Sequence, residues 1–468
     1  MLRHTIPVAA LLCSAALFPP AACAADDLEL QQLRQEIDTL RQDYEARLRA
    51  LEARLQQMQT PPVDAAAGTA SPAATAATNA PPAAPEPVAS AAPSGAANGF
   101  NPALSLILSG SYAHLSRDPA GYAIAGFLPG GEIGPGRRGF SLGESELGIS
   151  ANVDPWFYGA FNLALHGDDT ASVEEAYVQT TALPASLTLR AGRFFSGIGY
   201  LNEQHAHTWD FVDAPLAYQA FLGGQLAHDG LQLRALLPTE RFVELGAELA
   251  QGNRFPAGGD DRNQPGSAAL FAHTGGDIGA SQSWRAGVSL LWSRPEERAS
   301  DGLDATGRGI TNLFNGTGRL WVADAVWKWA PNGNPQRTNL KLQGEYFRRR
   351  ESGSLVFDST GAASADRYTS TQSGWYAQAV YQFVPTWRAG LRYDRLDVGS
   401  IDAGANAAAF ALPDFTPARV AAMLDWSPSE FSRVRLQLAR ERTRLGESDN
   451  QVFLQYQMSL GAHGAHSF

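Results

Sequence analysis

Apolar residues recur at every second position in segment after segment of this chain, from about residue 100 to its end. The segment WRAGLRYD at residues 387–394, for example, alternates large apolar residues with arginine, glycine and aspartate. Successive side chains of a β-strand point to opposite faces, so this period predicts strands with one apolar and one polar face. The apolar rows often begin or end in Trp, Tyr or Phe, and the polar rows carry charge at mid-strand. That combination is typical of a barrel whose outer face meets lipid and whose interior meets water.

The connections between the alternating segments support a closed barrel. No run in the sequence reaches the roughly 18 to 20 apolar residues that a membrane helix needs, and a closed barrel is the other structure that satisfies its backbone in lipid. Short turns marked by proline, as at Asp154-Pro155 and Val384-Pro385, alternate with longer polar loops such as residues 116–139, 294–318 and 351–369. We therefore predict an all-β fold over residues 100–468, a transmembrane antiparallel β-barrel of roughly sixteen strands with short turns at one end and long loops at the other.

The first 24 residues are typical of a secretory signal. Arg3 supplies the positive start, an apolar core follows, and Ala22-Cys23-Ala24 fits a cleavage site. Cys23 as the acylated residue of a lipoprotein is the alternative. Both cysteines, Cys13 and Cys23, lie in this leader, so we expect no disulfide in the mature chain.

Residues 28–59 predict a coiled coil. Apolar residues beginning Leu30, Leu33, Ile37 and Leu40 are spaced alternately three and four apart, and the spacing slips once by four, as in a stutter. A single amphipathic helix docked on a folded domain is the alternative. Residues 60–98 are rich in Ala, Pro, Ser and Thr, which predicts a disordered, extended linker. We expect the coiled coil to lie in the periplasm, where it would organise a homo-oligomer or contact peptidoglycan.

The stretch from Gly192 to Gly224 is too long for a hairpin turn and too rich in aromatic and acidic residues for a slack linker. We predict that it is the third outer loop and folds into the mouth of the barrel, where it narrows a water-filled channel. The candidate constriction residues are Arg193, Glu203, His205, His207, Asp210 and Asp213.

Strand parity predicts which charged side chains point inward and form the lumen wall. They are Glu144, Glu146, Glu244, Glu248, Arg285, Asp324, Lys341, Glu345, Arg388, Arg392, Asp394, Arg433 and Arg435. Acids on the loop that face a largely arginine wall would create a transverse field that orients dipolar solutes. The alternative is that these charges only pair with one another and hold the wall together.

His205 and His207, with Glu203 and Asp210 nearby, have residue types that suit a zinc or copper site. Solvated or hydrogen-bonded loop histidines are the alternative, and His463 and His466 form a weaker pair. We find no H-E-x-x-H and no serine, histidine and acid that the sequence places together, so we predict no enzyme activity and no cofactor. The formal net charge of −11 argues against nucleic acid as a partner.

Several stretches carry a family resemblance: RAGRFFSGIGYLNEQHAHTWDFVDAPL, STQSGWYAQAVYQF, WRAGLRYDRLD and the terminal QVFLQYQMSLGAHGAHSF. With them the chain resembles a proteobacterial outer-membrane porin of the phosphate-selective porin O/P type. The resemblance implies a trimer in the outer-membrane lipid and passive diffusion of small hydrophilic solutes. Members selective for phosphate crowd arginine and lysine at the constriction, whereas this loop carries acids and histidines. The terminal Phe468, in register with the last apolar row, resembles the recognition signal of the barrel-assembly machinery.

Three functions are therefore open from the sequence. The first is a passive channel narrowed by the third loop. The second is a barrel that only anchors the coiled coil and tethers it to the cell wall. The third is a metal-related uptake component that uses the two loop histidines.

Overall fold

The computed structural model of the chain describes residues 102–461, except 169, 260–261, 304–307 and 411–414. The predicted signal, coiled coil and linker lie outside the described residues, as do His463, His466 and Phe468. Among the described residues, no helix has the length and hydropathy of a membrane span.

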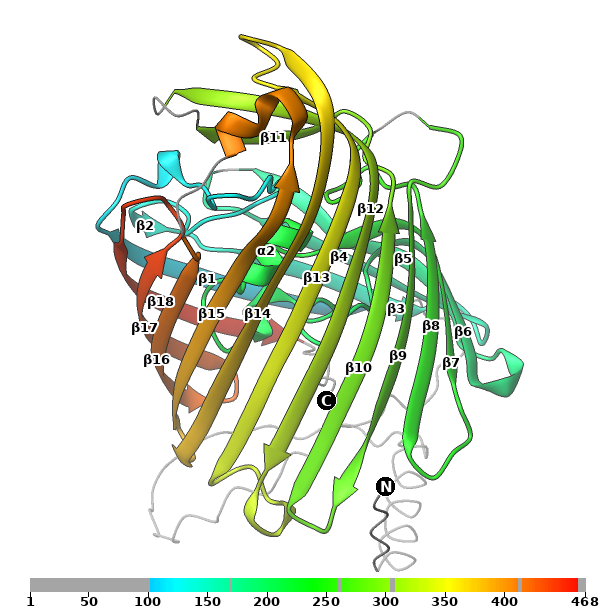
Figure 1. Ribbon diagram of the computed structural model, residues 1–468. Helices are drawn as coiled ribbons and strands as arrows, with labels where there is room; N and C mark the ends of the chain where they lie inside the picture. The colour runs from blue at the N-terminus through cyan, green and yellow to red at the C-terminus, as the bar shows by residue number, and fades with distance from the viewer. Residues whose placement is uncertain (1–101, 169, 260–261, 304–307, 411–414, 462–468) are drawn as a thin grey trace, which may run out of the picture. The chain divides into compact units, whose positions relative to one another are not determined.

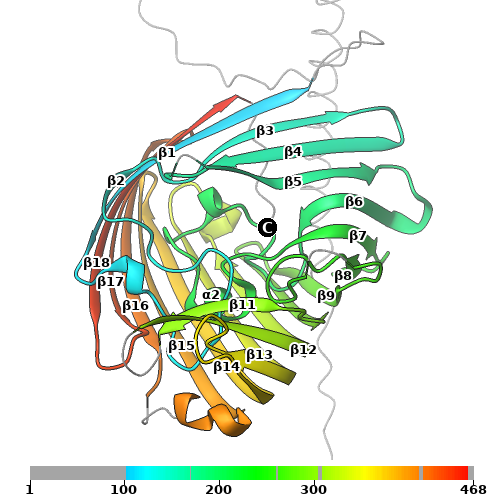
Figure 2. The same ribbon diagram turned by 90° about the horizontal axis from the view of Figure 1, so that it is seen from above.

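Sixteen long strands form a closed antiparallel barrel (Figures 1 and 2). They are β1 (Ala103–Leu115), β3 (Ser145–Asn152), β4 (Phe157–Leu165), β5 (Ala171–Thr180), β6 (Leu187–Phe195), β7 (Ala227–Leu236), β8 (Phe242–Ala250), β9 (Ser267–Ile278), β10 (Gln282–Ser293), β12 (Gly309–Trp329), β13 (Asn339–Phe357), β14 (Ser364–Val384), β15 (Trp387–Asp402), β16 (Ala418–Ser429), β17 (Ser432–Arg442) and β18 (Asp449–Gly461). Each pairs with its neighbours in this order, and β1 pairs with β18 from Ser105↔Gly461 to Leu115↔Gln451. The ring is thereby closed, which confirms the predicted fold class and strand number.

The connections between the long strands contain two short strands and several short helices. The strand β2 (Gly139–Ser141) pairs with β1, and β11 (Arg298–Leu303) pairs with β12. The helices are η1 (Pro119–Gly121), η2 (Pro184–Ser186), η3 (Ala206–Thr208), α2 (Leu216–Leu222), η4 (Pro331–Gly333) and η5 (Gly404–Phe410). Of these, η3 and α2 belong to the connection between β6 and β7, which contains the functional site.

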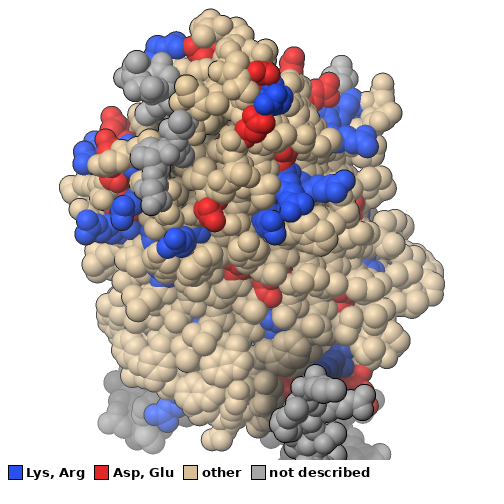
Figure 3. Space-filling view, in the orientation of Figure 1, with Lys and Arg blue, Asp and Glu red and all other residues tan. Residues whose placement is uncertain are grey.

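The alternation read from the sequence sets the two faces of the barrel wall. On β15, Leu391 is 67% exposed, whereas Arg392 and Asp394, of opposite parity, are buried. The apolar outer rows are edged by aromatic residues, such as the stacked Trp387 and Trp426. Figure 3 shows a broad surface with few charged side chains, above which most of the exposed charged side chains gather. An apolar exterior around a charged interior is the reverse of a water-soluble barrel, and it belongs in lipid.

The short turns lie where the sequence predicts them, but two of the long loops are largely strand. The expected loop at residues 351–369 contains the ends of β13 and β14, which pair as far as Phe357↔Ser364. The expected loop at residues 294–318 contains β11 and the start of β12. These extensions are rich in Ser, Gly and Thr on both faces, so they lack the apolar row from which a strand is recognised.

Candidate functional site

The connection between β6 and β7, residues 196–226, is called here the inner segment. It carries η3 and α2, and all seven residues of α2 are buried. Seen along the barrel in Figure 2, α2 lies inside the ring of strands. Gly223 ends the helix in the left-handed region at φ +71°, and its N–H donates to the Tyr218 carbonyl, as in a helix C-cap. The helix can therefore stop within one turn and return the chain to β7.

Apolar side chains of α2 pack on inward-facing residues of the strands. The ring of Tyr218 lies 5.2 Å from that of Phe347 on β13, and the ring of Phe221 stacks on Phe347 at 6.0 Å. Leu396 of β15 belongs to the same buried cluster. An inward-facing phenylalanine is out of place in a wet lumen, and parity alone could have flagged Phe347 because it lies between Glu345 and Arg349 on the same face. Burial of this patch is a large part of what holds the inner segment.

Carboxylates of the wall hold the backbone of the inner segment. Glu345 accepts hydrogen bonds from the amides of Tyr200 and Leu201 at 3.2 and 3.1 Å and from the Tyr218 hydroxyl at 3.0 Å. Asp394 accepts from the Leu216 amide at 3.0 Å, at the start of α2. These acids were predicted as lumen charges, and in the structure they bind a peptide chain.

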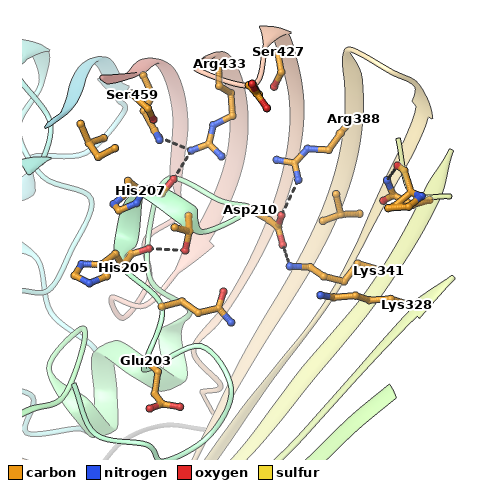
Figure 4. A pocket seen from close by; sticks show the side chains of 18 of the residues that line it. Glu203, His205, His207, Asp210, Lys328, Lys341, Arg388, Ser427, Arg433 and Ser459 are labelled. Atoms are coloured by element: carbon orange, nitrogen blue, oxygen red, sulfur yellow. Dashed lines mark hydrogen bonds and ion pairs between the residues drawn. The ribbon is translucent and has the colours of Figure 1, made fainter. Parts of the chain in front are cut away.

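On the side of β13 to β17, acids of the inner segment meet the basic residues of the wall. Asp210 forms ion pairs with Lys341 and, at 3.2 Å, with Arg388 (Figure 4). Asp213 forms ion pairs with Arg392 at 2.8 Å and with Arg419. Burial alone would raise the pKa of Asp210, but Lys341 and Arg388 hold it well below the usual value for aspartate. Burial is likewise outweighed at Asp213, where Arg419 and Arg392 lower the pKa. Both acids therefore stay ionised at neutral pH.

On the side of β3 to β5, the two histidines of the inner segment meet glutamates. His205 Nδ1 lies 3.1 Å from Glu146 and 3.2 Å from Glu174, and its Nε2 lies 3.0 Å from Glu175. His207 Nδ1 lies 2.7 Å from the other oxygen of Glu146. Burial would lower the pKa of His205, but its hydrogen bonds to Glu146, Glu174 and Glu175 raise it well above the usual value.

Glu174 and Glu175 were missed by the sequence analysis for a geometric reason. Adjacent residues of a regular strand point to opposite faces, so both could not be placed in the lumen. The pairing of β4 with β5 shifts register between Asn162↔Glu175 and Leu163↔Val173, which leaves Glu174 as the extra residue of a β-bulge. The bulge directs both carboxylates toward His205. A bulge of this kind leaves no signal in the strand period.

A cavity of about 1130 Å³ separates these two sides of the lumen. It extends from the short turns at residues 279–283 and 427–432 to the inner segment. The ionisable residues around it include Glu146, Glu175, Glu203, His205, His207, Asp210, Lys328, Lys341, Arg388 and Arg433. Figure 4 shows His205 and His207 on one side and Lys328, Lys341 and Arg388 on the other.

Other predicted residues lie apart from this cavity. Arg392 and Arg435 are buried beneath the inner segment, and neither they nor Glu144 and Arg285 are among the lining residues. Arg435 donates to Asp425 at 2.7 Å and to the Trp209 carbonyl at 2.9 Å. Arg392 and Arg435 thus pair with neighbouring acids, as in the alternative in which lumen charges hold the wall together.

Arg193 and Glu203 have partners on β7. Arg193 shares the parity of the exposed Leu189 and forms an ion pair at 2.6 Å with Asp229. It therefore lies apart from the other five candidate constriction residues. Glu203 forms an ion pair with Arg234, whose guanidinium also approaches Glu244.

The protein is thus a closed barrel with an apolar outer face and an internal cavity lined by ionisable side chains. No family model matches the chain, so the resemblance to phosphate-selective porins stays a prediction. The chain is 31% identical over 394 residues to an uncharacterized protein of Aquifex aeolicus (strain VF5), which covers 79% of this chain and 80% of that protein. The chain belongs to the same family as this Aquifex protein.

Solved structures with a similar fold include outer-membrane proteins and channels. A loop L8 deletion mutant of the outer-membrane protein OmpT of Vibrio cholerae is 11% identical, covers 78% of this chain and all of its own, and has a TM-score of 0.49. The outer membrane channel DcaP of Acinetobacter baumannii is 13% identical. The match covers 77% of this chain and 98% of DcaP, with a TM-score of 0.46. The anion-selective porin from Comamonas acidovorans is 11% identical. The match covers 77% of this chain and 100% of that porin, with a TM-score of 0.45.

Proposed function

We propose that the protein is an outer-membrane porin, through which small hydrophilic solutes and ions diffuse passively. The observation that carries the proposal is the ionisable cavity of about 1130 Å³ inside a barrel with an apolar outer face. Such an exterior requires a lipid environment, and such an interior holds water. Passive diffusion needs a hydrated path and no chemical step.

We further propose that the inner segment narrows this path. Its acids and histidines contact both sides of the lumen. Asp210 pairs with Lys341 and Arg388 on one side, and His207 contacts Glu146 on the other. Carboxylates on one side of a narrow gap and ammonium and guanidinium groups on the other create a field across it, which favours dipolar solutes over apolar ones.

The remaining parts of the proposal concern partners. We propose a homo-oligomer, with three protomers as the expected number, and a periplasmic coiled coil that organises it or contacts peptidoglycan. A solved form of OmpT of Vibrio cholerae is described as a trimer. Cross-linking of the full chain in native membranes, compared with a chain that lacks residues 28–59, tests both points.

The channel is tested in planar bilayers with the purified full chain. We expect stepwise conductance, and in a salt gradient the Arg388→Glu variant should shift the reversal potential toward cation preference because Arg388 lines the cavity. Arg367→Glu is the matched control, since Arg367 is exposed and pairs with the exposed Asp402. Absence of conductance from correctly folded protein would refute the channel. An identical reversal potential in Arg388→Glu and wild type would remove Arg388 from the permeation path.

A further inference from the structure

We propose that Glu146, His205 and His207, with Glu174 as a fourth ligand, bind a divalent transition-metal ion of the zinc type. The ligands come from three parts of the chain, namely β3, the bulge of β5 and the inner segment. Metal binding itself does not depend on the proposed channel, but its effect on conductance rests on that function.

The first argument is the convergence of donor atoms. One donor atom from each of Glu146, His205 and His207 falls in a group whose members all lie within 4.8 Å of one another. The two imidazoles lie 2.7 and 3.1 Å from the oxygens of Glu146, and Glu174 lies 3.2 Å from His205 Nδ1. Ligand atoms at zinc–nitrogen and zinc–oxygen bond lengths around a tetrahedral ion are about 3.3 Å apart. Each pair of donors from Glu146, His205 and His207 therefore lies within about 1.5 Å of the spacing that an ion requires, a difference that side-chain rotation can supply.

The second argument is an unpartnered acid beside the same group. Glu144 Oε1 is buried and has no hydrogen-bond partner among the described residues. A carboxylate oxygen of Glu144 lies within 4.8 Å of oxygens of Glu146 and Glu174. Carboxylates removed from water and placed side by side repel one another, and a cation between them removes that repulsion.

The balance of charge around the histidines points the same way. Glu144, Glu146, Glu174 and Glu175 face two imidazoles, and Arg190 and Arg254 add positive charge near Glu175 and Glu174. Arg433 donates to the His207 carbonyl and to Gln457, not to these carboxylates. A divalent ion would place positive charge between the carboxylates of Glu144, Glu146 and Glu174 themselves.

The donor set selects the kind of ion. Two imidazole nitrogens and two carboxylate oxygens suit zinc and similar divalent transition metals. Calcium and magnesium prefer all-oxygen surroundings and higher coordination numbers. Glu146, His205 and His207 line the cavity, so an ion can reach them from the lumen.

A bound ion has a mechanical and an electrostatic consequence. His205 and His207 lie on the inner segment, and their rings are stacked 5.6 Å apart. Coordination to Glu146 and Glu174 would fasten this segment to β3 and β5. It would also reduce the negative charge of that side of the lumen, which should weaken any preference for cations.

Binding is tested on the full chain, purified in detergent, stripped with a chelator and titrated with zinc chloride by calorimetry and equilibrium dialysis. We expect one zinc ion per chain, and Co²⁺ in its place should give the strong visible absorption of a tetrahedral site. The double variant His205→Ala/His207→Ala should lose the site, and Glu146→Gln should weaken zinc binding at least tenfold. Calcium and magnesium should not compete.

The matched control is His114→Ala, because this histidine is exposed on β1. A second control, His463→Ala/His466→Ala, removes the other histidine pair of the sequence. Both controls should bind zinc as the wild type does. Heat-modifiable migration on gels verifies that each variant is folded, and Glu146→Gln keeps the test valid if the double alanine variant does not fold.

Either of two results overturns the site: wild type that binds no zinc, or variants at His205, His207 and Glu146 that bind it as tightly as wild type. Conductance is measured separately. Zinc binding without any conductance would refute the channel and leave the site standing, whereas conductance without zinc binding would do the opposite.

Discussion

Replacement of Arg419 by methionine is the most direct test of how the inner segment is held. Arg419 lies on β16 with its side chain 1% exposed. It forms ion pairs with Asp213 of the inner segment, with Asp394 of β15 and, at 3.4 Å, with Glu441 of β17. It also donates to the Ala214 carbonyl at 2.7 Å, two residues before α2.

The size of the effect follows from what methionine leaves behind. Asp213 and Asp394 keep Arg392, but among the described residues Glu441 keeps only its hydrogen bond from the Thr443 hydroxyl, at 3.0 Å. Removal of one partner from a buried ion pair costs about 3–5 kcal/mol because a buried charge is left uncompensated. Since two of the three acids retain a guanidinium, we expect a loss near the lower end, about 3 kcal/mol.

The assay is equilibrium unfolding in urea of protein folded in detergent, followed by tryptophan fluorescence, with proteolysis of the inner segment as a second reading. Arg442→Met is the control, because Arg442 is exposed on β17, and its replacement should change the free energy of unfolding by no more than about 0.5 kcal/mol. The double variant Arg419→Met/Asp213→Asn should be less destabilised than the sum of the single variants, since they share one interaction. Equal stabilities of Arg419→Met and Arg442→Met would refute the role of the Arg419 ion pairs in holding the inner segment.

Three further predictions concern the same segment. Phe221→Ala should lower the free energy of unfolding by about 3–5 kcal/mol, because the ring is fully buried in the apolar cluster, and an unchanged urea midpoint would contradict this. Gly223→Ala should also destabilise the protein, because its φ is +71° and a Cβ would lie 2.5 Å from the Gly130 carbonyl oxygen; normal resistance of the segment to protease would count against it. The lowered pKa values of Asp210 and Asp213 mean that their ion pairs contribute stability above about pH 3.9, the usual aspartate value, and lose it as the pH falls through the lowered values. Protease resistance of the wild type at about pH 4.5 should therefore equal that at pH 7 and decline only in stronger acid, and a wild-type decline already between pH 7 and about pH 4.5 would speak against this assignment.

The sequence by itself determined the barrel and the direction of its side chains. Side chains alternate between the two faces of a strand whatever the strand contacts. Arg388 and Arg392 could therefore both be placed on the inner face. Aromatic residues at the ends of the apolar rows indicated that these rows face lipid. Proline in the turns indicated an approximate number of strands. Strand ends rich in serine and glycine, such as residues 351–357, were predicted as loops because they lack a continuous apolar row.

Only the tertiary structure decided what each inward side chain meets. Arg388 lines the cavity, whereas Arg392, four residues away on the same face, is covered by Asp213 and Phe211 of the inner segment. The β-bulge that turns Glu174 inward depends on how β4 and β5 pair, and no local pattern encodes it. Parity is a property of one strand, but burial and ion pairing depend on residues far along the chain, and those contacts exist only once the barrel has closed around the inner segment.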